Sequence, residues 1–183
     1  FGGVTTTNTE FAIQRSTGAP NPTIYAATGN GGGRVLRSTD GGVTWTEQID
    51  NNFCGGQCFY DIAIAVDPND PNRVYLGGDP TLIFAHSSDG GQTFTRSEVG
   101  LHADSHVIVV ARSQPSTLYF GTDGGIYKST DSGGSWTILN NSQFSATQFM
   151  GLAVHPTDPN FTIGGTQDNG TNHYRADGTW RRI

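Results

Sequence analysis

The chain has 183 residues, 34% of them hydrophobic and 14% charged, so it is long enough to bury a substantial core. Its formal net charge is −6 and Lys128 is its single lysine, which argues against nucleic acid and anionic membranes as partners. No apolar run approaches the roughly 20 residues of a membrane span, so we expect no membrane insertion. The 26 glycines and 8 prolines are typical of an all-β chain with many turns.

One eight-residue stretch occurs three times along the chain. Residues 38–45 read Ser-Thr-Asp-Gly-Gly-Val-Thr-Trp, and closely related letters return at 87–94 and 129–136. In such a stretch the Asp caps its own turn through backbone N–H groups, glycine supplies a positive φ, and the aromatic residue packs back into a core. We therefore expect three hairpin turns, each with an Asp cap and a largely buried aromatic anchor: Asp40 with Trp45, Asp89 with Phe94, and Asp131 with Trp136.

The spacing of these turns predicts a repeated sheet unit. Their aspartates are 49 and 42 residues apart, which suits one four-stranded blade of a β-propeller per repeat. A second phrase supports the same register, because residues 64–78 are echoed at 152–165. In both copies an apolar run meets a Pro/Asp/Asn turn and then a second run, as in a hairpin.

Four blades then account for the chain as a single segment, 1–183, with the strands of each blade counted from the inside of the propeller outward. Blade one (11–49) is predicted at 11–17, 23–28, 33–38 and 43–49, and blade two (61–98) at 61–67, 73–78, 82–87 and 92–98. Blade three (106–139) is predicted at 106–112, 117–121, 125–129 and 134–139. Blade four (148–183) is predicted at 148–155, 161–165, 171–175 and 179–183, with Trp180 in the aromatic slot of a shortened turn.

The three repeated stretches resemble the Asp-box, or BNR, repeat family, which includes sialidases, xyloglucanase-type glycoside hydrolases and sortilin-like receptor domains. The resemblance implies a propeller of six or more blades. We therefore expect this chain to be part of a larger propeller whose remaining blades are its partners; a closed four-bladed propeller is the alternative. Members of the family use the box as a structural clasp, so the resemblance informs about fold rather than activity.

The two cysteines, Cys54 and Cys58, lie four residues apart in a glycine-rich loop. A zinc site would need two further ligands close by, and a redox motif would need the spacing Cys-x-x-Cys. We expect a small loop disulfide, which implies a secreted or extracytoplasmic location. The chain starts at Phe1 without a signal peptide, as expected of a processed or excerpted sequence.

Propeller topology sorts the loops onto two faces. The boxes share one face. The loops 50–60, 102–106, 121–125 and 165–170 lie on the other, which is where we expect functional residues, because such residues concentrate on loops held by a rigid scaffold.

His102, Asp104 and His106 alternate with period two, so an extended backbone would place all three side chains on one side. Two imidazoles and a carboxylate could bind a divalent metal or tune a proton donor. Alternatively, one histidine satisfies buried backbone groups while Asp104 caps a turn. We predict a ligand-binding role for the histidines, with no assigned metal ion and no cofactor.

Asp123 and Asp168 occupy equivalent second-to-third turns of neighbouring blades, so we expect their carboxylates to face each other near the channel mouth. Paired carboxylates are the minimum for glycoside hydrolysis, and their separation decides the stereochemistry. Turn capping is the alternative role for each. Gln167 and Asn169, which flank Asp168, are predicted to bind ligand.

Residues 122–128 read Thr-Asp-Gly-Gly-Ile-Tyr-Lys. They resemble the segment Thr-Asp-x-Gly-Gly-x-Tyr-Arg that carries a catalytic aspartate in xyloglucanase-type glycoside hydrolases, although one residue after the Asp is missing here. The resemblance implies a catalytic role for Asp123, and Asp168 or Asp104 would supply the second carboxyl. A sialidase would need an arginine triad and a Phe/Tyr-Arg-Ile-Pro segment, and neither is recognisable in this sequence.

Four aromatic residues could stack on sugar rings if exposed, or pack in the core: Phe53, Phe59, Tyr60 and Phe149. The first functional hypothesis is an extracellular propeller segment of a carbohydrate-active protein that resembles the xyloglucanase-type glycoside hydrolases and acts on a polysaccharide or other glycan. The second is a non-catalytic sortilin-like or adhesin-type propeller that binds protein or glycan, and the third is a structural repeat array of a large secreted protein. Carboxylate spacing separates the first two, since a glycosidase pair lies about 5–9.5 Å apart.

Overall fold

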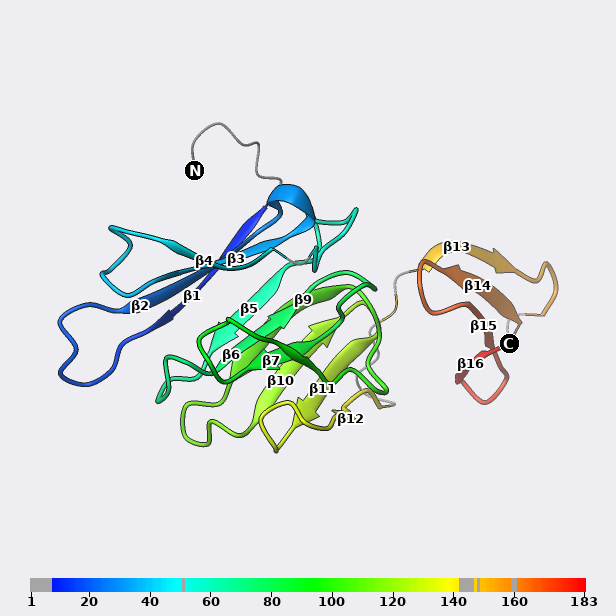
Figure 1. Cartoon of the computed structure of the whole chain (residues 1–183). Helices are drawn as coiled ribbons and strands as arrows, with labels where there is room; N and C mark the ends of the chain where they lie inside the picture. Colours follow the sequence, from blue (N-terminus) through cyan, green and yellow to red (C-terminus); the bar gives the residue numbers. More distant parts are fainter. Residues whose placement is uncertain (1–7, 51, 142–146, 148, 159–160) are drawn as a thin grey trace.

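The chain folds into four separate sheets, each of four antiparallel strands in sequence order (Figure 1). This computed structural model describes residues 8–50, 52–141, 147, 149–158 and 161–183. The four sheets are the four predicted blades of an all-β propeller fold. Residue 148, the predicted first position of blade four, lies outside the described residues.

The strand bounds agree with the sequence prediction to within about three residues at most positions. Blade one has β1 (Thr9–Gln14), β2 (Thr23–Thr28), β3 (Arg34–Ser38) and β4 (Thr46–Asp50), with a 3-10 turn, η1 (Asn30–Gly32), after β2. Blade two has β5 (Ala63–Val66), β6 (Val74–Gly77), β7 (Ala85–Ser87) and β8 (Thr95–Arg96). Blade three has β9 (Ser105–Val110), β10 (Leu118–Thr122), β11 (Gly125–Ser129) and β12 (Thr137–Ile138). Blade four has β13 (Phe149–Val154), β14 (Thr162–Thr166), β15 (Thr171–Tyr174) and β16 (Trp180–Arg182).

The repeated stretches form the turns into the outermost strands of blades one to three. Oδ1 of Asp89 accepts the backbone N–H of Thr93 at 2.9 Å, Oδ2 accepts the Thr93 hydroxyl, and Ser87 donates its hydroxyl to the same carboxylate. Asp40 and Asp131 repeat this arrangement with their own neighbours. Because each turn occupies the residues up to the aromatic position, β4, β8 and β12 begin three residues later than predicted.

The aromatic anchors of these turns are less buried than the sequence predicts. Trp45, Phe94 and Trp136 are each half-buried rather than largely buried. Phe94 and Trp136 pack against buried core residues, and the ring centroid of Trp45 lies 6.5 Å from that of Phe11. Trp136 shows the inward contact, because its ring centroid lies 4.7 Å from that of Phe84 in the neighbouring blade.

Two apolar clusters hold blades one, two and three together. One joins blade one to blade two around Tyr25, Phe53 and Leu76, and the other joins blade two to blade three around Phe84 and Phe120. Cores of this kind form because aromatic and branched side chains alternate along the paired strands and meet those of the next sheet.

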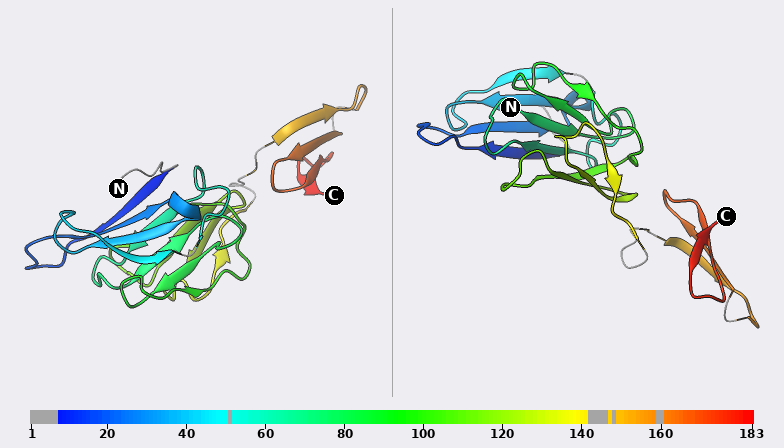
Figure 2. Two further views of the ribbon diagram at one scale, coloured as in Figure 1. Left: turned by 45° about the horizontal axis from the view of Figure 1, so that its top comes forward. Right: turned by 90° about the horizontal axis from the view of Figure 1, so that it is seen from below.

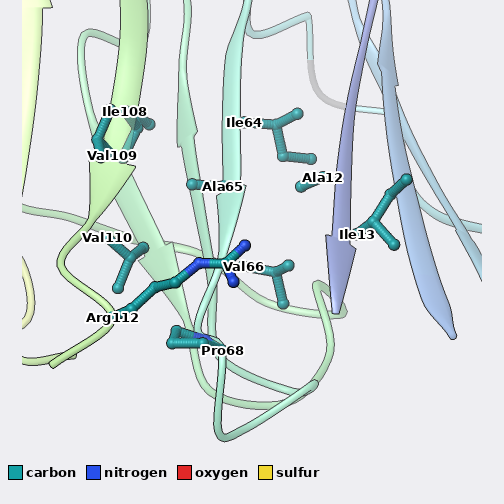
Figure 3. Close-up of a pocket in the computed structure, with 10 residues that line it drawn as sticks. All are labelled: Ala12, Ile13, Ile64, Ala65, Val66, Pro68, Ile108, Val109, Val110 and Arg112. Atoms are coloured by element: carbon teal, nitrogen blue, oxygen red, sulfur yellow. The ribbon is translucent and has the colours of Figure 1, made fainter. Parts of the chain in front are cut away.

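The first strands of these three blades, β1, β5 and β9, lie side by side. Their inward residues line an apolar hollow of about 250 Å³, with Arg112 at one end (Figure 3). The lining comes from β1, β5 and β9 and the segments that follow them: Ala12, Ile13, Ile64, Ala65, Val66, Pro68, Ile108, Val109, Val110 and Arg112. The first strand of each of these blades is therefore the inner one, as expected for a propeller.

Blade four pairs its own strands fully but lies to one side of the other three (Figures 1 and 2). Every residue of β13 is exposed, and so is every residue of β16. Trp180 takes the aromatic slot of the shortened turn and contacts Phe149 at 4.9 Å between ring centroids. No helix in the described part of the chain is long and apolar enough to cross a membrane.

Candidate functional site

Three carboxylates predicted to lie on one rim meet at the ends of blades three and four. Asp104 precedes β9, Asp123 forms the turn between β10 and β11, and Asp168 lies in the turn between β14 and β15. One oxygen from each lies within 4.8 Å of the others. The three residues line a pocket of about 330 Å³ together with Gln57, Phe59, Tyr60 and Gln167.

The turn that carries Asp123 is tight because glycine permits a close approach. Only Asp123 and Gly124 separate β10 from β11, and the N–H of Gly124 donates to the Thr122 hydroxyl at 3.1 Å. A Cβ atom on Gly124 would lie 2.3 Å from Cβ of His102. Glycine at this position therefore lets the loop before β9 lie directly against the Asp123 turn.

The loop before β9 is not extended, which corrects one step of the sequence prediction. Asp104 has φ of 64°, in the left-handed region that non-glycine residues seldom occupy. The period-two alternation of residues 102–106 therefore breaks at its centre. The carbonyl of Asp104 instead accepts the N–H of Asp123 at 3.3 Å, which brings the two aspartates together by a turn.

The two histidines hold the aspartate turns but do not converge on each other. Nε2 of His106 contacts Oδ1 of Asp123, and the His106 ring meets Tyr60 edge-on at 4.7 Å between centroids. Nε2 of His102 lies 3.4 Å from the backbone carbonyl of Asp168. Each imidazole therefore positions one aspartate turn.

The turn between β14 and β15 also contacts blade three directly. Nδ2 of Asn169 donates to the backbone carbonyl of Asp123 at 3.3 Å. Gln167 lines the shared pocket. Asp168 sits among acidic neighbours, so burial first and then the nearby Asp123 raise its pKa above the ordinary value. Contacts from blade four thus complete a site that begins on blade three.

Asp61 is a further acidic residue at this site, and sequence reasoning missed it. It is fully buried just before β5, and neither carboxylate oxygen has a hydrogen-bond partner. Burial, followed by the charge of the adjacent Asp104, raises its pKa to about 7. Its only sequence signal is an acidic residue directly before an apolar run, and that pattern is equally typical of a strand end.

The loop that leads to Asp61 is closed by the predicted disulfide. Cys54 and Cys58 are bonded to each other, with their Cα atoms 4.8 Å apart. Within this loop, Nε2 of Gln57 donates to Oδ1 of Asp104 at 3.0 Å. The cross-link therefore stabilises one wall of the carboxylate pocket.

The candidate sugar-stacking aromatics differ in exposure. Phe53 is fully buried in the core between blades one and two, so it is unavailable to a ligand. Phe59 and Tyr60 are 66% and 46% exposed and line the pocket. Phe149 is 37% exposed on blade four.

Curated xyloglucanases share sequence similarity with this chain. It is 31% identical over 125 residues to a probable oligoxyloglucan-reducing end-specific xyloglucanase of Neosartorya fischeri. This alignment covers 60% of this chain and 15% of that protein. It is also 30% identical over 155 residues to a xyloglucanase of Hypocrea jecorina. That alignment covers 76% of this chain and 18% of the relative. The chain therefore spans less than a fifth of the curated relatives it matches. No family model matches it.

Solved propellers share its fold. A GH74 enzyme of Niastella koreensis superposes with a TM-score of 0.59 at 24% identity, over 93% of this chain and 29% of that chain. A structure of YCF48 bound to D1 peptide gives a TM-score of 0.52 at 17% identity, over 97% of this chain and 55% of that chain. Sequence and fold together support a xyloglucanase-type propeller segment.

Proposed function

We propose that this chain is a segment of an extracellular propeller that acts on a β-glucan polysaccharide of the xyloglucan class. We further propose that the carboxylate pocket contacts the sugar chain. The observation that carries the proposal is the similarity to xyloglucanases across 60% and 76% of this chain in the two alignments. Residues 122–128 resemble the segment that carries the catalytic aspartate of those enzymes, and Asp123 within them lines the pocket. The disulfide between Cys54 and Cys58 supports an extracytoplasmic location.

The pocket combines two kinds of group that suit a sugar. Phe59 and Tyr60 present exposed ring faces on which the apolar face of a pyranose can stack. Beside them, the carboxyl oxygens of the aspartates can accept hydrogen bonds from sugar hydroxyls, and the Gln167 amide can both accept and donate them. A pocket of this composition binds a glycan without a deep apolar cavity.

The spacing of the carboxyl groups limits which of them can act together as acid and base in glycoside hydrolysis. Retaining glycosidases hold their two carboxyl groups about 5–5.5 Å apart, and inverting enzymes hold them about 6.5–9.5 Å apart. One oxygen each of Asp104, Asp123 and Asp168 lies within 4.8 Å of the others, which is closer at these atoms than the separation of an inverting pair. We assign a general-base role to Asp123, which contacts His106 and lies in the segment that resembles the catalytic segment, and place the general acid elsewhere in the parent protein.

The test is cleavage of xyloglucan by the full-length parent protein that carries Asp123→Asn. Loss of a general base should lower the rate by about 10²–10⁴-fold. Asp89→Asn removes the same charge from a turn on the opposite face and should leave the rate unchanged. If Asp123→Asn cleaves normally, Asp123 has no catalytic role. If the wild-type parent cleaves no member of a polysaccharide panel, the non-catalytic glycan- or protein-binding alternative replaces this proposal.

A further inference from the structure

Asp61 is a buried carboxyl group to which no other group donates a hydrogen bond. It lies just before β5 with no exposed surface, and no N–H or O–H of the described residues donates to either of its oxygens. The carboxyl group of Asp104 lies within hydrogen-bonding range of it. A buried ionised carboxylate normally accepts several hydrogen bonds or pairs with a cation, because its charge is costly to bury without them. The surroundings of Asp61 do not suit an ionised carboxylate.

Two carboxyl groups in hydrogen-bonding range of each other need a proton between them. Ionised carboxylates only accept hydrogen bonds and repel each other, whereas a protonated carboxyl group can donate to its neighbour. Asp123 and Asp79, from two further segments, also act on Asp61 with negative charge, and Tyr60 directly precedes it in the chain. His106 contacts Asp123 rather than Asp61. The groups that face Asp61 therefore favour its neutral form, which can donate a hydrogen bond.

The acceptor of that hydrogen bond belongs to a strained loop. Asp104 has φ of 64°, and such a conformation persists only where the surrounding structure fixes it. Gln57 donates to Oδ1 of Asp104 at 3.0 Å, and the Asp104 carbonyl accepts the N–H of Asp123 at 3.3 Å. A hydrogen bond from Asp61 adds a second restraint on the Asp104 carboxyl group, from the side of blade two.

We propose that Asp61 is a positioning residue, which holds a proton in the pH range where exposed aspartates are ionised and donates it to the Asp104 carboxyl group. The hydrogen bond keeps the Asp104 loop against the Asp123 turn, so Asp61 acts on the general base through Asp104. The role in catalysis rests on the proposed function, whereas the hydrogen bond between the two carboxyl groups does not.

The first test compares the Tm of Asp61→Asn with that of the wild-type chain from about pH 4 to about pH 8. The Asn side chain keeps an N–H donor for Asp104 but has no proton to lose. Burial, followed by the charge of Asp104, raises the pKa of Asp61 to about 7, so the folded chain binds this proton more tightly than the unfolded chain. Wild type therefore loses stability as the pH rises from about 4 to about 7, and the Tm of Asp61→Asn minus that of wild type should become more positive. A difference that stays constant with pH would overturn the proposal.

Asp67, at the other end of β5, provides the matched control. It is also buried, but Oδ1 accepts the N–H of Asn69 at 2.8 Å and Oδ2 lies 4.0 Å from Nη1 of Arg73. Because these partners favour the ionised form, the Tm of Asp67→Asn minus that of wild type should not rise over the same pH range. An equal rise in both variants would overturn the assignment of the proton to Asp61.

The positioning role is tested by xyloglucan cleavage in the full-length parent protein at about pH 6. Asp61→Asn keeps the donor and should cleave within about twofold of wild type, whereas Asp61→Leu, of similar size without a donor, should be about 10–10²-fold slower. As the pH rises through about 7, Asp61→Asn should also lose less of its rate than wild type does. The pH profile of Asp61→Asn tests the role even if Asp61→Leu folds poorly.

The outcomes separate the two proposals. Equal loss of rate in Asp61→Asn and Asp61→Leu, or a pH profile of Asp61→Asn identical to that of wild type, would assign Asp61 to packing and overturn its positioning role. A wild-type parent that cleaves no polysaccharide would overturn the proposed function and this positioning role with it. The Tm comparison would then still decide whether Asp61 donates a proton to Asp104.

Discussion

Blades two and four contain the same repeated phrase, yet they differ in what surrounds them. In blade two, all four residues of β5 and all four of β6 are buried, because sheets pack on both sides. In blade four, the corresponding strand β13 is exposed throughout, and Met150, Leu152 and Val154 face solvent. The strand pairing is nevertheless complete in both. Local sequence is therefore enough to build a blade, whereas neighbouring blades are needed to bury it.

This contrast explains the composition of β13. An apolar strand with exposed side chains indicates a surface that another element covers. We expect the remaining blades of a larger propeller to cover it, because β13 is the first strand of its blade and the first strands of blades one to three lie side by side and line one hollow.

The largest expected effect comes from the same substitution made in each region. Leu76→Ala in β6 of blade two removes a fully buried side chain and should lower the free energy of unfolding by about 2–5 kcal/mol. Leu152→Ala in β13, where the side chain is 61% exposed, should change it by less than about 0.5 kcal/mol. Urea unfolding followed by tryptophan fluorescence measures both. Equal losses would mean that blade four is buried to the same extent in solution.

A smaller effect concerns the turn aspartates. Hydrogen bonds from Thr93, then from Ser87, lower the pKa of Asp89 to about 2, from the ordinary 3.8. Because the folded-state pKa is depressed, the stabilisation is complete above the unfolded pKa and is lost as pH falls toward about 2. The Tm deficit of Asp89→Asn against wild type should therefore be full at pH 6 and shrink between about pH 4 and 2.

The matching turn of blade four provides the control for this pH series. Asp177 accepts hydrogen bonds from the N–H and hydroxyl of Thr179, which lower its pKa, but this turn is two residues shorter than the boxes. The Tm deficit of Asp177→Asn against wild type should be smaller than that of Asp89→Asn and should also shrink as the pH falls. Calorimetry from pH 6 to pH 2 compares the two variants. A deficit for Asp89→Asn that stays constant with pH would contradict the role of its ionised carboxylate.

The sequence predicts the strands well because their signals are local. Repeated turns with Asp, Gly and an aromatic residue define where each outer hairpin lies, and alternating apolar residues define the strands beside them. The exposure of Trp45 and Trp136 could not be predicted in the same way, because it depends on how far neighbouring blades extend over the ring.

The sequence predicted which residues form the candidate site better than it predicted how they are arranged. Equivalent turns place Asp123 and Asp168 on one rim, and the structure brings them together with Asp104. Their spacing depends on the left-handed backbone at Asp104 and on the close approach at Gly124, neither of which has a pattern in sequence. Asp61 was missed because its burial follows from the packing of blade two against blade three.

The central claim is that the carboxylate pocket, rather than the exposed strand β13, binds the polysaccharide. Titration with a xyloglucan oligosaccharide, in wild type and two aromatic variants, tests it most directly. Tyr60→Ala removes an exposed ring from the carboxylate pocket and should weaken binding at least about tenfold. Phe149→Ala removes a partly exposed ring from β13 and should leave binding unchanged. Loss of binding in Phe149→Ala with full binding in Tyr60→Ala would contradict the account.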